Sequence, residues 1–356
     1  MTGLLTLTAL LLTAAPLKVR VLEREKPVRA KLEAKTLRCD GKPLPGTTVE
    51  VEGFDRRLKA GAAMCDEIDA TGAVRVTVGE LKRGYAGRIV LAWEGTVLRL
   101  LNEVDVEAYL PGVLGSEAAQ LPPAAQRAQA VVSRTFALAS RGRHGLQGYD
   151  LCDLAHCQVF HGQADENVAT QDAVLKTKDR VLLTGGVGLK PAFFHAACGG
   201  GTSRAEDVFG DEGAGAAVSD VGKNGPSCKD APNFKWSLEV DRAQLGQALG
   251  VKPEGISFEP LKRDRLGRVM EVRAFGQRFK GTDFQSRLGR VFGYHVFQSM
   301  KVTASEVEGV VRFEGTGLGH GVGLCQYGAK AMAEAGADDA AILKKYFPDC
   351  RVAPAP

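Results

Sequence analysis

The sequence predicts an α+β protein in which a β-rich N-terminal region packs on a mixed α/β region. Residues 18–102 contain short runs of alternating or β-branched side chains separated by turn signals, which is typical of small antiparallel sheets. Residues 125–139 instead repeat apolar side chains at spacings of three and four, as a buried helix does. The 356 residues, of which 44% are hydrophobic, suffice for one large domain or two smaller ones. We expect a β-rich region at 18–100 and a larger mixed domain at 101–352.

The expected strands of the N-terminal region are residues 19–22, 47–51, 74–78 and 88–93, and residues 98–106 continue as a further strand. Dipeptides such as Asp40-Gly41 and Glu94-Gly95 mark the turns. A helix is expected after Pro122-Pro123, because proline is tolerated in the first helical turn. The remaining expected elements are helices at 164–178, 242–249 and 284–290, strands at 180–184, 191–198 and 269–274, and a surface loop at 211–230.

Residues 1–17 are interpreted as an export signal. The apolar run 3–15 is shorter than the roughly 20 residues that span a bilayer, but it has the length of a signal-peptide core. No basic residue precedes this run, and Pro16 follows the natural cleavage site, so a buried first strand or helix is the alternative. The interpretation predicts an exported protein, located in the periplasm, in the cell wall or outside the cell.

Charge and motifs exclude several classes of protein. The net charge is +4, and no basic run interleaved with aromatic residues is present, so nucleic acid is not an expected partner. A mildly basic surface suits an anionic polymer, although it is also an ordinary surface. The chain has no Gly-x-Ser-x-Gly elbow, no His-Glu-x-x-His motif and no P-loop, which removes the commoner hydrolase and nucleotide-binding functions.

Eight cysteines form an even set, as in many disulfide-bonded exported proteins. Cys39 with Cys65 is the simplest pairing, because both lie in the β-rich region. Cys152, His156 and Cys157 are spaced so that two thiolates and an imidazole can bind one ion, for which zinc is the candidate. A disulfide between Cys152 and Cys157 is the competing interpretation. The candidates for a fourth metal ligand are His144, His195 and Cys198.

Glu117 lies between a glycine-punctuated segment, which begins at Tyr109, and the expected helix. Its neighbours include Val113 and Leu114, so the carboxyl is expected against an apolar wall. Desolvation raises the pKa of a carboxyl and keeps it protonated near neutral pH. An acid that delivers a proton to a glycosidic oxygen must be protonated in this way. Glu117 is therefore a candidate general acid, and the alternative is a surface carboxylate ahead of a helix.

Residues 315–329 carry glycine at alternate positions over their first half, which predicts a loop held by neighbouring segments and followed by a helix. A merely structural histidine would have little packing there, so His320 is a candidate substrate contact. Residues 199–201 are three consecutive glycines, which let backbone approach a ligand closely. Backbone amides of this kind suit a sugar polymer with acetamido and lactyl groups. A dinucleotide site is excluded, because no β-α-β unit surrounds the glycines.

Four blocks of sequence together resemble the SpoIID family, which comprises stage II sporulation protein D and the amidase enhancer LytB. In the family's order, these blocks are Tyr109-Leu110-x-Gly112-Val113-x-x-Ser116-Glu117, Ala128-Gln129-Ala130-Val131-x-x-Arg134-Thr135, Cys152-Asp153-x-x-His156-Cys157-Gln158-Val159 and Gly319-His320-Gly321-Val322-Gly323-x-x-Gln326-Tyr327-Gly328-Ala329. The resemblance covers roughly residues 98–352. It implies that residues 101–352 form a SpoIID-like catalytic domain.

The resemblance implies a peptidoglycan lytic transglycosylase. Such an enzyme cleaves the glycosidic bond between N-acetylmuramic acid (MurNAc) and N-acetylglucosamine (GlcNAc), and the sugar's own 6-hydroxyl closes a 1,6-anhydro ring. The family's acid/base falls on Glu117, and its metal-associated cysteines fall on Cys152 and Cys157. Because the substrate supplies the nucleophile, one carboxyl acting first as acid and then as base suffices, whereas a hydrolase normally needs two. The expected partner is the glycan strand.

A substrate groove is expected around Glu117. We expect Arg134 to line this groove, but to order its helix rather than to touch substrate. The other expected contacts are His195, Gly200, Thr202, His320, Gln326 and Tyr327. The alternative from another class is a non-catalytic wall-binding protein that stimulates a cell-wall amidase. A zinc hydrolase is a third alternative, and it would produce reducing ends.

The chain departs from the family pattern at two places. Ala118-Ala119 stand where the family usually has Met-Pro, which changes the packing beside the acid. Cys198 and Cys325 stand where the family has serine, so a disulfide such as Cys198 with Cys228 competes with metal binding in this region.

Overall fold

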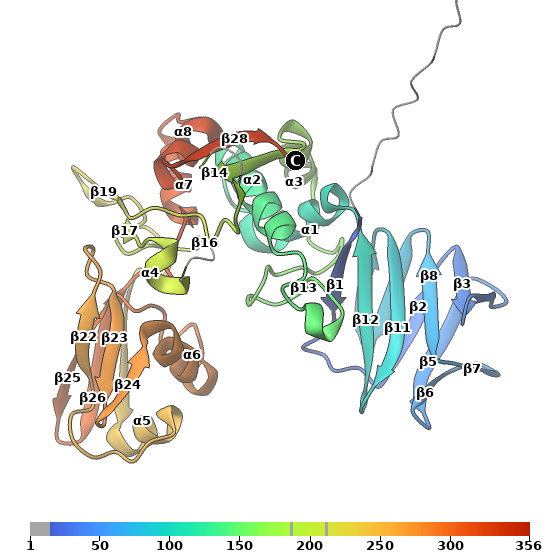
Figure 1. The fold of residues 1–356 in the computed structure, drawn as a ribbon, viewed down its shortest axis with the longest axis horizontal. Coiled ribbons are helices and arrows are strands. Elements are labelled where there is room, and N and C mark those ends of the chain that lie inside the picture. Colours follow the sequence, from blue (N-terminus) through green and yellow to red (C-terminus); the bar gives the residue numbers. More distant parts are fainter. Residues whose placement is uncertain (1–14, 186–187, 211–212) are drawn as a thin grey trace, which may run out of the picture. The chain divides into compact units, whose positions relative to one another are not determined.

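The computed structural model describes residues 15–185, 188–210 and 213–356, and these form an α+β protein with a β-rich N-terminal part (Figure 1), which confirms the predicted class. The apolar run of the expected export signal lies almost wholly outside the described residues. Among the helices that are described, none is long and apolar enough to cross a membrane. The chain divides into two compact units. The N-terminal unit runs to Tyr109 and includes residues 142–157, and the C-terminal unit holds residues 110–141 and 158–356. The domain boundary expected near residue 100 stays a prediction.

The N-terminal unit contains two antiparallel sheets. One short parallel strand, β13 (Leu151–Cys152), is added at the edge of the first sheet. The first sheet has the order β13, β1 (Leu17–Val21), β12 (Val97–Val104), β11 (Arg88–Glu94), β8 (Glu67–Thr71), β3 (Thr36–Cys39) and β4 (Lys42–Pro43). The second has the order β10 (Leu81–Tyr85), β9 (Val74–Val78), β2 (Arg29–Glu33), β5 (Thr48–Phe54), β6 (Arg57–Ala60) and β7 (Ala63–Cys65). The four strands expected before residue 94 are confirmed as β1, β5, β9 and β11.

Local sequence explains these strands. In β1 the residues Leu17, Val19 and Val21 are buried while Lys18 is exposed, as the period of two requires. The predicted disulfide between Cys39 and Cys65 is confirmed.

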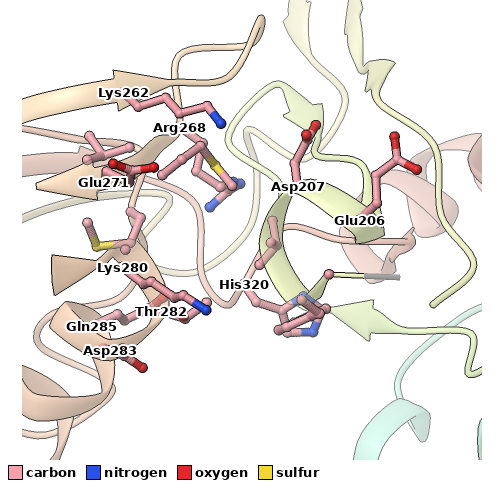
Figure 2. A pocket seen from close by; sticks show the side chains of 17 residues that line it. Glu206, Asp207, Lys262, Arg268, Glu271, Lys280, Thr282, Asp283, Gln285 and His320 are labelled. Atoms are coloured by element: carbon pink, nitrogen blue, oxygen red, sulfur yellow. The ribbon is translucent and has the colours of Figure 1, made fainter. Parts of the chain in front are cut away.

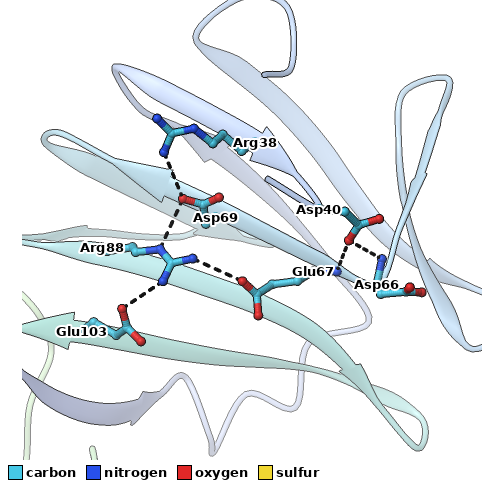
Figure 3. A network of polar contacts seen from close by, with 7 residues as sticks. All are labelled: Arg38, Asp40, Asp66, Glu67, Asp69, Arg88 and Glu103. Atoms are coloured by element: carbon cyan, nitrogen blue, oxygen red, sulfur yellow. Dashed lines mark hydrogen bonds and ion pairs between the residues drawn. The ribbon is translucent and has the colours of Figure 1, made fainter. Parts of the chain in front are cut away.

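A network of ion pairs crosses the first sheet of the N-terminal unit (Figure 3). The guanidinium of Arg88 on β11 contacts the carboxylates of Glu67, Asp69 and Glu103, which come from β8 and β12. Arg38 on β3 reaches Asp69 from the other side. Opposite charges on neighbouring strands favour this strand order, although each exposed pair adds at most about 1 kcal/mol.

The first half of the C-terminal unit is built around a buried helix. Helix α2 (Pro123–Ala139) begins at the expected prolines and packs against α3 (Val168–Lys176), α7 (Gln326–Glu334), α8 (Asp339–Tyr346) and β14 (Arg180–Thr184). Strand β14 pairs with β28 (Cys350–Pro354) and β15 (Gly188–Leu189). Shorter elements are β16 (Phe194–His195), β17 (Gly201–Thr202), α4 (Ala205–Phe209), β18 (Val218–Ser219), β19 (Val221–Gly222), β20 (Gly225–Pro226) and β27 (Leu324–Cys325).

Two three-stranded sheets and two helices form the rest of this unit around an aromatic core of Trp236, Phe284, Phe297 and Phe313. The strands are β21 (Lys235–Asp241), β26 (Val310–Thr316) and β25 (Val302–Val307) in one sheet, and β22 (Glu259–Arg263), β23 (Val269–Ala274) and β24 (Gln277–Lys280) in the other. The helices are α5 (Arg242–Leu249) and α6 (Gly281–Phe292), both as expected to within a few residues.

Four local predictions were wrong. Residues 106–118, taken as the end of a strand and a glycine-punctuated segment, form helix α1 (Val106–Ala118), which includes Pro111. The expected strand at 191–198 is only two residues long, and the expected loop at 211–230 contains the short strands β18 to β20. The glycine-rich loop is shorter than expected, because Gly315 and Thr316 belong to β26 and α7 begins at Gln326.

Candidate active site

Glu117 lies in the last turn of α1, in the C-terminal unit. The neighbouring Val113, Leu114 and Ala118 are fully buried, and the Glu117 side chain is half-buried, so the predicted apolar wall is present. Burial raises the pKa of the Glu117 carboxyl, while the Val159 N–H, which donates to Oε1 at 2.8 Å, lowers it together with the charge of His161. The effect of burial is the larger, so the proton is held to a higher pH than in an ordinary glutamate.

Two glycines of α1 let the segment 159–165 lie directly against this helix. A Cβ atom added to Gly112 would stand 2.2 Å from the carbonyl oxygen of Gly162, and one added to Gly115 would stand 2.1 Å from that of Asp165. Any side chain at either position would push the segment away. Glycine here serves the close approach of two backbones, because both residues have ordinary helical conformation.

This close approach brings a histidine and an aspartate beside Glu117, which the sequence analysis did not single out. His161 Nδ1 lies 2.7 Å from Asp165 Oδ2, and the same carboxylate oxygen lies 2.8 Å from the hydroxyl of Ser116, the residue before Glu117. A helical Gly-x-x-Gly spacing at 112 and 115, together with an acidic residue four positions after a histidine, was the available signal. It has meaning only once α1 is recognised as a helix.

The end of α1 is capped by two glutamines from other helices. Gln126 of α2 donates through Nε2 to the carbonyls of Ala118 and Ala119, at 3.3 and 3.0 Å. Gln326, at the start of α7, donates through Nε2 to the carbonyl of Glu117 at 3.0 Å. Carbonyls in the last turn of a helix have no partner within the helix, so these bonds satisfy them and fix the backbone that carries the candidate acid.

His320 and His195 lie side by side, with their ring centroids 5.5 Å apart. His195 is buried, and its Nδ1 lies 3.0 Å from the carbonyl of Val322, while His320 Nδ1 accepts the N–H of Val322 at 3.0 Å. Burial, helped by the nearby Arg268, lowers the pKa of His320 to about 4, and burial lowers the pKa of His195 well below its usual range. Both rings are therefore neutral near pH 7.

A polar pocket of about 480 Å³ opens beside His320 (Figure 2). Its charged side chains are of both signs and come from α4, from the sheet β22–β23–β24 with the turn between its first two strands, and from the start of α6. Glu117 is not among its lining residues. The charged residues are Glu206, Asp207, Lys262, Arg268, Glu271, Lys280 and Asp283.

The other predicted contacts are mostly internal. Arg134 is fully buried in α2 and donates to the carbonyls of Val174 and Arg180, so it orders the neighbouring α3 and β14. Thr202 in β17 is also fully buried and donates to the carbonyl of Ala216, and Gly200 is buried in the bend that precedes this strand. Tyr327 is half-buried, with the ammonium of Lys330 over its ring at 5.8 Å.

The predicted metal ligands meet in the N-terminal unit. The ligand atoms of Cys152, His156 and Cys157 all lie within 4.8 Å of one another and of a fourth side chain, His144. His144 Nε2 is 3.4 Å from Cys157 Sγ, and His156 Nδ1 is 3.5 Å from it. Both cysteines are free thiols. Of the three candidates for a fourth ligand, His144 is therefore the one that joins this cluster.

We expect Gly115→Ala to destabilise the C-terminal unit. Alanine improves helix propensity by up to about 1 kcal/mol, but overpacking costs roughly 1–3 kcal/mol, and the obstacle here is a backbone oxygen. The thermal unfolding midpoint should therefore fall, and amides of 159–165 should exchange faster with solvent. Gly145→Ala is the matched control, because its added methyl group meets nothing within 4 Å. Equal stability of the two variants would contradict this packing.

We expect Glu117→Gln to be more stable than the wild type at pH 8. The pKa of Glu117 is raised in the folded state, so the protonated form stabilises the fold, and this contribution is lost as the pH rises through the folded-state pKa. The difference should vanish below about pH 4, where the carboxyl is protonated in the unfolded chain also. Thermal unfolding from pH 3.5 to 8 measures it. The exposed Glu254→Gln is the control and should show no such pH dependence.

Comparison with known proteins finds a family model that matches the region of this site. The family model for the stage II sporulation protein SpoIID matches residues 94–183, which include Glu117 and the Cys152–Cys157 segment. Stage II sporulation protein D of Bacillus subtilis is 25% identical over 326 residues, which are 86% of this chain and 91% of that protein. The amidase enhancer of Bacillus subtilis is 28% identical over 276 residues, which are 63% of this chain and 37% of that protein.

An uncharacterized protein of Brachyspira hyodysenteriae is 28% identical over 277 residues, which are 74% of this chain and 70% of that protein. The matched residues 94–183 contain the first three of the four sequence blocks. Residues 94–183 therefore match the SpoIID family model, and the chain is similar over most of its length to stage II sporulation protein D and over part of it to the amidase enhancer.

Proposed function

We propose that the chain is a peptidoglycan lytic transglycosylase that cleaves the MurNAc–GlcNAc bond of glycan strands and forms 1,6-anhydro-MurNAc ends. The observation that carries the proposal is the half-buried carboxyl of Glu117, whose pKa is raised by burial on a backbone that two glutamines hold. A carboxyl with a raised pKa keeps its proton to a higher pH than an ordinary glutamate and can act as a general acid.

In the proposed reaction Glu117 acts twice. Its proton passes to the bridging oxygen as the bond from that oxygen to C1 of MurNAc breaks, and GlcNAc leaves as an alcohol. The Glu117 carboxylate then takes the proton of the MurNAc 6-hydroxyl as that oxygen bonds to C1. No water is consumed, and Glu117 ends protonated. The Val159 N–H and the charge of His161 favour the carboxylate that exists between the two steps.

Asp165 is a second carboxylate in this region, but it has another role in the proposal. Its Oδ2 lies within hydrogen-bonding distance of both His161 and Ser116, which leaves that oxygen occupied. We assign it to holding His161 beside Glu117. A water-activating role for Asp165 would give reducing ends, so the chemical nature of the product separates the two assignments.

For the substrate groove we propose His320 and Tyr327 as glycan contacts, since both remain partly accessible. The buried residues Arg134, His195 and Thr202 would support the groove from within. Gly200 would also support the groove, because it forms a tight turn. Gln326 would support it through its hydrogen bond to the end of α1. The pocket beside His320 would accept polar substituents of the polymer.

We further propose that His144, Cys152, His156 and Cys157 hold a structural zinc ion. Two thiolates and two imidazoles are a donor set that suits zinc, and four protein ligands close the coordination sphere. When bound, the ion would cross-link His144 and the 156–157 segment to Cys152 of strand β13, which pairs with β1. No step of the reaction uses it.

The cellular setting follows from the substrate. Peptidoglycan lies outside the cytoplasmic membrane, so the proposal includes export by the N-terminal segment. The second candidate function is a non-catalytic protein that binds the cell wall and stimulates an amidase, and the similarity to the amidase enhancer of Bacillus subtilis favours it. The same site would then bind glycan without cutting it.

Digestion of purified glycan strands tests the catalytic proposal. We expect products with 1,6-anhydro ends in mass spectrometry, and Glu117→Gln should slow their formation at least about a hundredfold, as loss of a general acid does. The wild-type rate should fall as the pH rises through the elevated pKa of Glu117. Glu254→Gln is the control. Reducing ends would indicate a hydrolase, and glycan binding without cleavage would favour the amidase enhancer.

The zinc proposal is tested by elemental analysis of the purified full chain combined with titration of its thiols. We expect Cys152→Ser with Cys157→Ser to lower the zinc content by about one ion per chain. Cys350→Ser, which removes a half-buried cysteine elsewhere, should leave the content unchanged. Absence of zinc together with absence of free thiols at 152 and 157 would mean that the disulfide forms instead.

A further inference from the structure

A second cluster of ligand-type side chains lies in the C-terminal unit. The sulfur atoms of Cys198, Cys228 and Cys325 and a carboxylate oxygen of Asp220 all lie within 4.8 Å of one another. The three cysteines are fully buried and Asp220 is 1% exposed. They come from three separate segments: the turn after β16, the segment from β18 past β20, and the junction of β27 and α7.

The spacing of these atoms is that of ligands around one ion. The sulfurs of Cys198 and Cys228 are 3.5 Å apart, and Cys198 Sγ is 3.3 Å from Asp220 Oδ2. With zinc–sulfur bonds of about 2.3 Å in a tetrahedron, two thiolates lie ~3.8 Å apart, whereas a disulfide requires ~2.05 Å. A single disulfide would also leave one of the three buried thiols and the carboxylate unused.

Backbone N–H groups point at the sulfur atoms. Cys325 Sγ accepts the N–H of Cys198 at 3.3 Å and that of Gly328 at 3.4 Å, the latter in the first turn of α7. The amides of Gly199 and Gly200 hydrogen-bond Cys228. Such donors stabilise thiolates rather than thiols, and they are the usual outer partners of metal-bound cysteines.

The charge around the cluster also matches a bound divalent cation. Three thiolates and one carboxylate carry four negative charges, of which zinc would offset two. Lys345, whose ammonium pairs with Asp220 Oδ1, and the buried Arg268, which donates to the carbonyl of Cys198 at 3.2 Å, offset the others. Tyr346 donates to Asp220 Oδ2 at 3.1 Å and orients the carboxylate.

We propose that Cys198, Cys228 and Cys325 bind a second zinc ion, with Asp220 as the fourth ligand. Sulfur ligands favour zinc over the hard cations, and four protein ligands make a closed structural site. The ion joins the triple-glycine turn, the 218–228 segment and the start of α7. Cys325 immediately precedes Gln326, so the site also fixes the residue that caps α1 at Glu117. The proposal does not depend on the reaction that the protein catalyses.

Zinc counting by native mass spectrometry on the full chain tests this site. The variant Cys152→Ser/Cys157→Ser removes the other cysteine cluster and should retain about one zinc ion. Adding Cys325→Ser or Cys228→Ser to it should abolish that zinc, whereas adding Cys350→Ser, the matched control, should not. Adding Asp220→Asn should release the zinc at a lower chelator concentration. Cobalt loaded into the double variant should show thiolate-to-metal absorption that is lost with Cys228→Ser.

The opposite results are equally clear. A double variant without zinc, whose non-reduced digest contains a peptide linked through Cys198 and Cys228, would overturn the proposal. Zinc that persists after Cys325→Ser and Cys228→Ser would overturn it too. If a variant fails to fold, the wild type decides, because two zinc ions per chain support the site, and at most one ion together with the linked peptide contradicts it.

Discussion

The candidate site depends on one contact, the direct packing of α1 against the segment 159–165. Glycines at 112 and 115 allow it, and the added Cβ distances of 2.2 and 2.1 Å to carbonyl oxygens show that no larger residue fits without movement. The contact desolvates Glu117 and at the same time supplies the Val159 N–H and the charge of His161. Since desolvation is the larger effect, the carboxyl favours its protonated form while retaining groups that stabilise the ion.

Support for this contact comes from segments far apart in the sequence. The carbonyls at the end of α1 are bound by Gln126 of α2 and Gln326 of α7, separated by 200 residues in the chain. Beneath them, the buried Arg134 ties α2 to the backbone of α3 and β14. A carboxyl that must donate and regain a proton at one place benefits from a backbone held on several sides.

The sequence predicted what depends on local pattern. The strands β1, β5, β9 and β11, the helix after Pro122 and the Cys39–Cys65 pair could be predicted, because alternation, turn residues and proximity express themselves locally. Helix α1 was misread because Pro111, Gly112 and Gly115 disfavour helices in isolation, while their value lies in a tertiary contact. His161 and Asp165 were overlooked for the same reason. His144 could be named as one of three candidates for the fourth metal ligand. The spacing of ligands in the sequence could not decide among the three, because the fourth ligand comes from a separate part of the chain.

The glycine-rich loop explains why this fold would gain from buried cross-links. Gly317, Gly319, Gly321 and Gly323 all have positive φ, and the last three also leave room for His195, Arg268 and the backbone of Phe193. Ordering such a segment is costly in conformational entropy, because glycine loses more freedom on folding than any other residue. The loop has few side chains with which to offset that cost. A metal-binding cluster that includes Cys325 would tie the C-terminal end of this loop to two other segments and would offset part of that cost. Cys325 is the residue before Gln326, the glutamine that caps α1.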